Sequence, residues 1–158
     1  MQVQVNPILK NITAYPAQTG RMQFFGTRLD FNERTVPVSF AVQKAIKKWA
    51  AQGDTFVYPE DARCLTAVSA YAGLNNEKVL LTNGSDRAIE LIFRAFVQKG
   101  DCVIIPSPSF SIFYKNAALA EAEVIRPLYK ENGEFPFKEA DALLKKGAKI
   151  LIICNPNN

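Results

Sequence analysis

Histidine is absent from the 158 residues, and tryptophan occurs only once. Without histidine, this chain alone cannot form a Ser-His or Cys-His nucleophile pair, an HExxH zinc site or a His-ligated haem site. The three cysteines, Cys64, Cys102 and Cys154, include no C-x-x-C pair, and their odd number argues against a disulfide framework. We therefore expect no metal site, and we expect a reducing, cytoplasmic environment.

Charge of one sign and long apolar runs are also scarce. The 19 basic and 15 acidic residues give a net charge of +4, which falls short of the dense Lys/Arg clusters of nucleic-acid-binding proteins. No uninterrupted apolar run approaches the roughly 18 residues of a membrane helix, and the N-terminus lacks the pattern of a secretion signal. We expect a soluble, untargeted protein that binds neither nucleic acid nor membranes.

Hydrophobic residues make up 48% of the chain and aromatic residues 11%, which is typical of a globular protein of about one domain. Residues 1–36 contain Pro and Gly breakers and little periodicity, so we interpret them as an N-terminal arm and small-domain segment. From residue 37 onward, helical patterns alternate with short apolar runs. We predict that residues 37–158 belong to a second, larger unit.

This alternation predicts an order of elements. Apolar residues at helical spacing predict helices over 37–53, 61–72, 85–100, 110–120 and 138–146, and short apolar runs predict strands over 78–82, 102–105, 123–127 and 149–154. About twenty residues separate successive strands, which is enough for a helical crossover, so the strands should pair in parallel. We predict an α/β fold, a mostly parallel sheet with helices on both faces, preceded by the N-terminal arm, with Ile150–Ile153 as a central strand.

The last predicted strand is followed by Asn155-Pro156-Asn157-Asn158, where the sequence stops. Ligand sites of open parallel sheets lie outside the carboxyl ends of the strands, so this loop is a candidate part of a site. An asparagine amide there can donate to a ligand oxygen, although Asn and Pro are also ordinary turn residues. Because the loop is cut in mid-turn, we expect the sequence to be a piece of a longer protein.

The clearest local signal is the segment Leu80–Asp86, which leads from a predicted strand into a helix. Gly84 can adopt a positive φ. The free N–H groups of Ser85, Asp86 and Arg87 would lie at the positive end of the helix dipole, where phosphate binds. An ordinary turn capped by Ser85 or Asn83 fits the same residues. Neither a G-x-G-x-x-G nor a P-loop motif is present, so dinucleotide and P-loop functions have no direct support.

Two aromatic residues are further candidates. Phe110 follows the carboxyl end of a predicted strand and could stack on a planar ring, although aromatics at this spacing also fill cores. Tyr58 precedes a proline and could donate a hydrogen bond to an anion, although a tyrosine in such a turn is also explained by packing. Each signal is weak when taken alone.

Seven segments occur in the order found in one enzyme family. They are, from the N-terminus, Asn11-Ile12-Thr13-Ala14-Tyr15-Pro16, Arg28–Glu33, Tyr58-Pro59-Glu60, Leu80–Asp86, Gly100-Asp101, Pro106–Phe110 and Asn155–Asn158. Each segment is generic, but the ordered set covers most of the chain and is specific. In this set the sequence resembles the N-terminal part of a fold-type I pyridoxal-phosphate-dependent aminotransferase, closest to the histidinol-phosphate aminotransferase family.

The resemblance implies a cofactor, pyridoxal 5′-phosphate (PLP), and residues that hold it. The backbone amides of Ser85 and Asp86, next to Gly84, would bind the phosphate, which agrees with the anion site expected from helix physics. Phe110 would lie against the pyridine ring, and Asn158 would donate to its phenolic oxygen. Residues 37–158 would then be a partial PLP-binding large domain, truncated at the C-terminus.

The resemblance also implies a homodimer and small-molecule substrates. Tyr58 would reach the phosphate bound in the neighbouring subunit, so that the two subunits share their active sites. Tyr15 and Asn32 would lie towards the substrates, an amino compound such as histidinol phosphate and a 2-oxo acid. The implied reaction transfers an amino group between these two substrates, with PLP as the carrier.

Departures from the family pattern bear on function. Arg34 and Thr35 stand where a second Asn and Pro usually follow the Asn-Glu pair, and Phe110 stands where Tyr is common, so the substrate is open. The Asp that pairs with the pyridinium nitrogen, the Lys that binds PLP covalently and the Arg residues for phosphate and carboxylate have no counterparts in residues 1–158. We therefore assign no catalytic residue and expect these residues alone to be inactive.

Other functions stay open on the sequence. A threonine-phosphate decarboxylase shares the scaffold and the cofactor, and residues 1–158 barely distinguish it from an aminotransferase. A non-catalytic remnant of this fold could act as an interaction module. A methyltransferase-like nucleotide-binding domain is a third alternative, but the single glycine of the Val79–Gly84 turn and the later Pro106–Phe110 segment count against it.

Overall fold

The computed structural model describes residues 4, 6–12, 20, 23, 25–28, 31–34, 36–52, 54–58 and 62–157. The elements found in them are, in chain order, η1 (Pro7–Asn11), α1 (Phe40–Ala51), η3 (Asp54–Phe56), α2 (Ala62–Ala72), η4 (Asn76–Lys78), α3 (Gly84–Phe96), β1 (Cys102–Ile104), α4 (Ser111–Leu119), β2 (Glu123–Ile125), α5 (Phe137–Lys145) and β3 (Ile150–Leu151). The helices expected near 37–53, 61–72, 85–100, 110–120 and 138–146 are therefore confirmed.

Contacts between Cα atoms divide the chain into two units. The sheet unit comprises residues 1–14 and 81–158, and the helical unit comprises residues 15–80. In the helical unit, η3 contacts α1 and η4 contacts α2. The predicted domain boundary after residue 36 stays a prediction.

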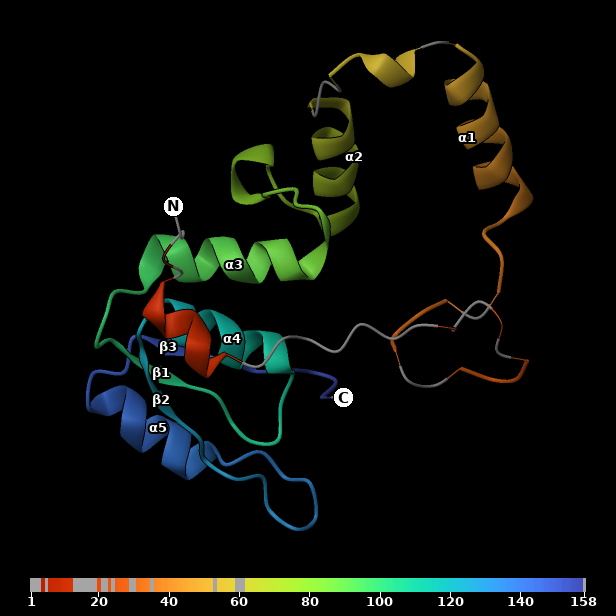
Figure 1. Cartoon of the computed structure of the whole chain (residues 1–158). Helices are drawn as coiled ribbons and strands as arrows, with labels where there is room; N and C mark the ends of the chain where they lie inside the picture. Colours follow the sequence, from red (N-terminus) through yellow and green to blue (C-terminus); the bar gives the residue numbers. More distant parts are fainter. Residues whose placement is uncertain are drawn as a thin grey trace. The chain divides into compact units, whose positions relative to one another are not determined.

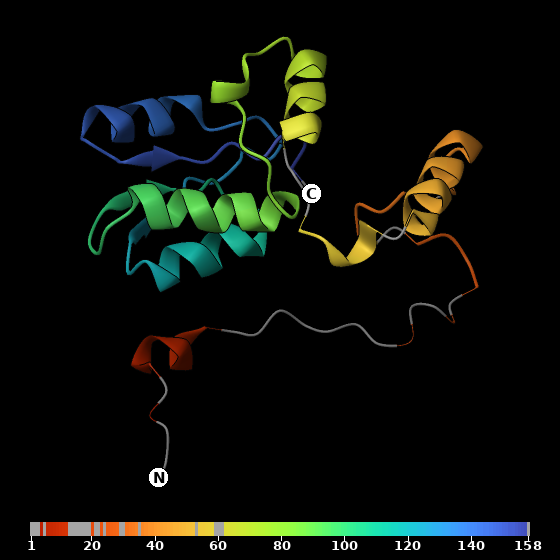
Figure 2. The ribbon, with the colours of Figure 1, turned by 90° about the horizontal axis from the view of Figure 1, so that it is seen from above.

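The sheet unit is built on three parallel strands in the order β2-β1-β3. Val103 of β1 lies opposite Val124 of β2 on one side and Ile150 of β3 on the other. Helices α3 and α4 lie on one face of this sheet and α5 lies on the other (Figures 1 and 2). This arrangement confirms the predicted α/β fold with a parallel sheet covered on both faces.

The core of the sheet unit lies between the sheet and the pair α3 and α4. Val103 and Ile105, both 0% exposed, form one cluster with Phe93 and Val97 at the end of α3 and with Ala117 of α4. Alternate residues of a strand point to the same face, so Val103 and Ile105 both reach these helices. Burial of this apolar face therefore fixes α3 and α4 against β1.

Two predicted strand assignments are wrong. Residues 78–82 form no strand: Lys78 ends the 3₁₀ helix η4, and Val79 is extended (φ −125°, ψ 128°) without pairing to a strand of the described part. The run Ile150–Ile153 is not central, because β1 holds the middle position and Ile153 is 61% exposed. An apolar run indicates that a segment is buried, but the position of a strand in a sheet depends on which other strands it pairs with.

The helical unit has well-formed helix ends but little core of its own. The Ser39 hydroxyl accepts a hydrogen bond from the Val42 N–H at 3.4 Å and caps the start of α1. Gly73, at φ 67°, ends α2 in the left-handed conformation. However, α1 contains no buried residue, and Ile46 and Trp49 are more than half exposed.

An acidic residue on α3 gives a testable pH dependence. The Arg87 hydrogen bond to Glu90 (2.8 Å) and the nearby charge of Arg94 hold the pKa of Glu90 below its usual value of 4.5. A carboxyl whose pKa is lowered by folding stabilises the protein above its unfolded-state pKa, and this contribution is lost as the pH falls through its lower folded-state pKa. We expect Glu90→Gln to reduce stability at neutral pH and to have a smaller effect below pH 4.5.

Urea denaturation at the two pH values measures the Glu90 effect. Glu131→Gln is the matched control, because Glu131 is exposed and forms no ion pair within the described residues. A Glu90→Gln effect that does not change with pH, or that equals the Glu131→Gln effect, would show that the arginine contacts do not stabilise α3.

Candidate functional site

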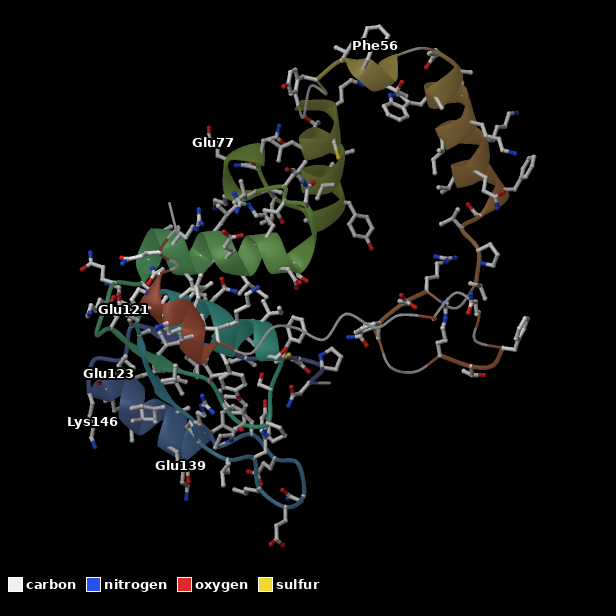
Figure 3. The ribbon with its side chains drawn as sticks, in the orientation of Figure 1. Phe56, Glu77, Glu121, Glu123, Glu139 and Lys146 are labelled. Atoms are coloured by element: carbon white, nitrogen blue, oxygen red, sulfur yellow. The ribbon has the colours of Figure 1, made fainter. Side chains whose placement is uncertain are left out.

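The predicted site residues of the sheet unit gather at one edge of the sheet. β1 leads at its carboxyl end into the loop that begins α4, and the N-termini of α3 and α4 lie at this same edge, as does the segment after β3 (Figure 1). Figure 3 shows Glu121 and Glu123 at the opposite, amino end of the strands. The carboxyl edge is the position at which open parallel sheets bind ligands.

The turn before α3 is held by two short hydrogen bonds. The Gly84 N–H donates to the Thr82 carbonyl at 2.8 Å, and the Thr82 hydroxyl donates to the Gly84 carbonyl at 2.8 Å. Asn83 between them has φ −75° and ψ 74°, the geometry of an inverse γ-turn. Gly84 follows at φ 77°, a left-handed conformation that favours glycine. The turn thereby satisfies its own polar groups by hydrogen bonding and directs the chain into α3.

The first turn of α3 has no cap. Asn83 occupies the N-cap position and makes no side-chain capping hydrogen bond, so the alternative of a turn capped by Asn83 is not observed. The N–H groups of Ser85 and Asp86 have no acceptor in the part of the chain that the structure describes. Unpaired N–H groups at a helix N-terminus attract an anion through hydrogen bonding and through the helix dipole. The geometry of this turn can therefore hold a phosphate group.

Phe110 occupies the N-cap position of α4 at the same edge of the sheet. Its side chain is partly buried, and its ring meets the Phe113 ring at a centroid distance of 5.9 Å and an interplanar angle of 90°. Phe113 packs against the core cluster, so the orientation of Phe110 is supported from the protein interior. Such a supported ring can stack on a planar ligand.

The structure does not place the remaining predicted site residues relative to this edge. Asn158 and Tyr15 lie outside the described residues. Tyr58, which is 95% exposed, and Asn32, which is also exposed, belong to the helical unit. The structure thus collects Gly84, Ser85, Asp86 and Phe110 within one unit, and the roles of all these residues stay predictions.

A hydrogen bond that the sequence analysis did not anticipate joins two loops at the carboxyl edge. Asn157 donates from its side-chain amide to the Pro108 carbonyl at 2.8 Å. Asn157 directly precedes Asn158, and Pro108 lies two residues before Phe110. The two residues are 49 positions apart in the sequence, so no local motif predicts their contact.

A group of polar side chains in the sheet unit, Tyr114, Arg126 and Tyr129, was also not predicted from the sequence. The Arg126 guanidinium lies over the Tyr114 ring, 4.5 Å from its centroid. The Tyr114 hydroxyl is buried and has no hydrogen-bond partner among the described residues. Burial, followed by the influence of Cys154 and Tyr114, raises the pKa of Tyr129. These side chains come from separate segments of the sequence, so no single motif predicts that they lie together.

A hollow is found in each unit. One, of about 260 Å³, lies between α3 and α4 and is lined by Glu90, Phe93, Arg94, Val97, Asn116, Leu119 and Ala120. The other, of about 230 Å³ in the helical unit, is lined by Gly26, Thr27, Arg28, Glu33 and Arg34. The second hollow contains two arginines and is a competing position for an anion.

Neither a metal centre nor a membrane helix is found in the described ranges. No group of three or more Cys, Asp or Glu side chains within them is arranged to hold a metal ion. No helix within them is long and apolar enough to cross a bilayer.

Comparison with known proteins decides the family. Residues 27–158 match the family described as aminotransferase class I and II. The chain belongs to this family. This aminotransferase-family chain is 25% identical to a histidinol-phosphate aminotransferase of Ruminiclostridium cellulolyticum, over 96% of this chain and 44% of that protein. It is 33% identical to a dihydroxyacetone phosphate transaminase of Campylobacter jejuni, over 83% of this chain and 37% of that protein.

The solved structures agree on the fold of this aminotransferase-family chain. The histidinol-phosphate aminotransferase of Sinorhizobium meliloti, solved in complex with pyridoxal-5′-phosphate, superposes with a TM-score of 0.84 at 19% identity. The match covers 100% of this chain and 44% of that structure. The aminotransferase-family chain therefore spans less than half the length of the relatives it matches.

Proposed function

We propose that residues 1–158 supply the phosphate- and ring-binding part of an aminotransferase cofactor site. The observation that carries this proposal is the uncapped first turn of α3, where Gly84 is left-handed and the N–H groups of Ser85 and Asp86 are unpaired. The 5′-phosphate of PLP fits these donors, because a dianion satisfies unpaired N–H groups at a helix N-terminus. Family membership makes PLP the cofactor that this geometry suits.

Four residues of the chain would bind and orient the cofactor. Ser85 and Asp86 would hold its phosphate through their backbone, and Phe110 would hold the pyridine ring by stacking. Asn158 would donate to the phenolic oxygen of the ring. When it is bound, PLP supplies the electron sink for amino-group transfer. For these residues alone we propose cofactor binding without turnover, because no lysine among them is assigned to bind PLP covalently.

For the reaction, we propose amino-group transfer from a phosphate-bearing amino substrate, such as histidinol phosphate, to a 2-oxo acid. The names of the relatives support a phosphate-bearing substrate, because histidinol phosphate, an amine, and dihydroxyacetone phosphate, a ketone, are both phosphate esters. Tyr15 and Asn32 would face the substrate. Threonine-phosphate decarboxylation is the alternative reaction on the same cofactor site.

For the assembly, we propose a cytoplasmic homodimer in which Tyr58 reaches the cofactor phosphate of the other subunit. The 95% exposure of Tyr58 supports this role, because its hydroxyl is free to meet a second chain. Sedimentation analysis of the protein measures the oligomeric state directly.

A non-catalytic interaction module is the second candidate function. Helix α1 favours it, because Phe40 is 79% exposed and Ile46 and Trp49 are also more than half exposed. Apolar side chains exposed along one helix are typical of an interaction surface. An interaction module needs no cofactor, so a cofactor titration separates the two candidates.

The titration should use pyridoxine 5′-phosphate, because this compound keeps the ring and phosphate of PLP but lacks the aldehyde that reacts with surface lysines. We expect it to bind at least about tenfold more tightly than pyridoxine, since hydrogen bonds to a charged group contribute about 1.5–3 kcal/mol each. Isothermal titration calorimetry measures both affinities. Equal affinities of the two compounds, or binding of neither, would contradict the phosphate site.

A further inference from the structure

At the carboxyl edge of the sheet, the loop that follows β1 is attached to the segments after β2 and β3 in different ways. On the β2 side, the Ser107 N–H donates to the Pro127 carbonyl at 2.8 Å, and the Tyr129 N–H donates to the Ser107 carbonyl at 3.1 Å. Both bonds use backbone atoms. This side of the loop between β1 and α4 therefore stays attached whatever side chains it carries.

On the β3 side, the attachment depends on one side chain. Backbone hydrogen bonds join β1 to the β3 region up to Ile152, whose N–H donates to the Ile104 carbonyl at 2.9 Å. Beyond Ile152, one hydrogen bond within residues 62–157 joins the loop after β3 to the loop between β1 and α4. It runs from the Asn157 amide to the Pro108 carbonyl. The identity of residue 157 therefore controls how the two loops are held together.

We propose that Asn157 is a positioning residue for the cofactor ring: its amide holds the loop after β3 against the loop that carries Phe110. This inference rests on the proposed function, which assigns the ring to Phe110 and to Asn158, the residue that follows Asn157 in the sequence. The α3 N-terminus, assigned to the phosphate, is separate from this contact. Asn157 therefore orders the ring-binding half of the site and leaves the phosphate-binding half unaffected.

The test replaces Asn157 with a residue of equal size that cannot donate. Asn157→Asp removes the donor and keeps the shape, and Asn155→Asp is the matched control, because Asn155 lies in the same loop, is exposed and makes no side-chain hydrogen bond in the described part. The probes are pyridoxine 5′-phosphate, which uses both halves of the site, and inorganic phosphate, which uses the α3 N-terminus.

We expect Asn157→Asp to weaken pyridoxine 5′-phosphate binding about two- to tenfold, the range for the loss of one hydrogen bond. Inorganic phosphate should bind as it does to the unchanged chain, and Asn155→Asp should change neither affinity by more than about twofold. A general loss of structure would weaken both probes. The inference is overturned if Asn157→Asp weakens both probes alike, or if its effect equals that of Asn155→Asp.

A second measurement separates failure of this inference from failure of the proposed function. Amide hydrogen exchange in the loop of residues 105–110, measured without ligand, should be faster in Asn157→Asp than in Asn155→Asp. If the unchanged chain binds no pyridoxine 5′-phosphate but this difference is seen, the proposed function fails and the loop attachment stands. If exchange is equal in the two variants, the attachment fails whether or not the cofactor analogue binds.

Discussion

Replacing Ile105 with alanine is expected to lower the free energy of unfolding by about 2–5 kcal/mol, the range observed for large-to-small changes in packed cores. Ile105 is 0% exposed and lies in one cluster with Phe93, Val97 and Ala117. The substitution removes its contacts to α3 and α4 and leaves a cavity under the two helices whose N-termini form the candidate site. Urea denaturation followed by far-ultraviolet circular dichroism measures the change.

Ile153→Ala is the matched control for Ile105→Ala. It makes the same chemical change at a side chain that is 61% exposed, so we expect an effect within about 0.5 kcal/mol. Trp49 belongs to the helical unit, so its fluorescence is not a substitute for circular dichroism here. If Ile105→Ala does not fold, Ile105→Val should show a loss of about 0.5–1.5 kcal/mol. Equal effects at positions 105 and 153 would show that the cluster is not the core.

Replacing Gly84 with alanine is expected to weaken pyridoxine 5′-phosphate binding about ten- to a hundredfold, which corresponds to the loss of one charge-assisted hydrogen bond. The φ of Gly84 is 77°, and a Cβ atom added there would meet no atom within 4 Å outside its neighbouring residues and its own helix. The cost therefore arises from the backbone, because an L-residue in this conformation is strained by about 1–2 kcal/mol. Relaxing the strain turns the N–H groups of Ser85 and Asp86 away from the phosphate. Calorimetric titration measures the loss.

Gly133→Ala is the matched control for Gly84→Ala. Gly133 has φ 79°, also with no atom within 4 Å of an added Cβ, and it lies in the turn between β2 and α5. We expect the two variants to lose similar stability, about 1–2 kcal/mol, and Gly133→Ala to keep the affinity of the unchanged chain. If Gly133→Ala weakens binding as much as Gly84→Ala, the effect is one of general stability and the α3 turn is not the phosphate site.

The helices could be predicted from the sequence, because the buried face of a helix is formed by apolar residues that lie close together in the sequence. The spacing of Ile89, Phe93 and Phe96 predicts α3, and the structure buries Phe93 while leaving Phe96 61% exposed at the helix end. Pairing between strands depends on distant partners. For this reason β1, β2 and β3 were located, but the central position of β1 and the absence of a strand at residues 78–82 were not predicted.

In the candidate site, too, residues of one short segment could be predicted, whereas contacts between distant segments could not. Gly84, Ser85 and Asp86 could be proposed from one short segment, because a glycine before an amphipathic helix predicts both the turn and the free N–H groups. The contact between Asn157 and Pro108 could not be proposed, because it requires β1 and β3 to be neighbours. The buried Tyr114 hydroxyl has the same explanation, since its surroundings come from several segments of the sheet unit.

The most direct test of the phosphate site is a nuclear magnetic resonance titration of the ¹⁵N-labelled chain with pyridoxine 5′-phosphate. The account predicts that the largest chemical-shift changes occur at the backbone amides of Ser85 and Asp86, because these N–H groups gain a charged acceptor. It also predicts that the amide of Gly133, which has nearly the same positive φ as Gly84, does not shift. Largest changes at Arg28 and Arg34, the two arginines of the hollow in the helical unit, would contradict it.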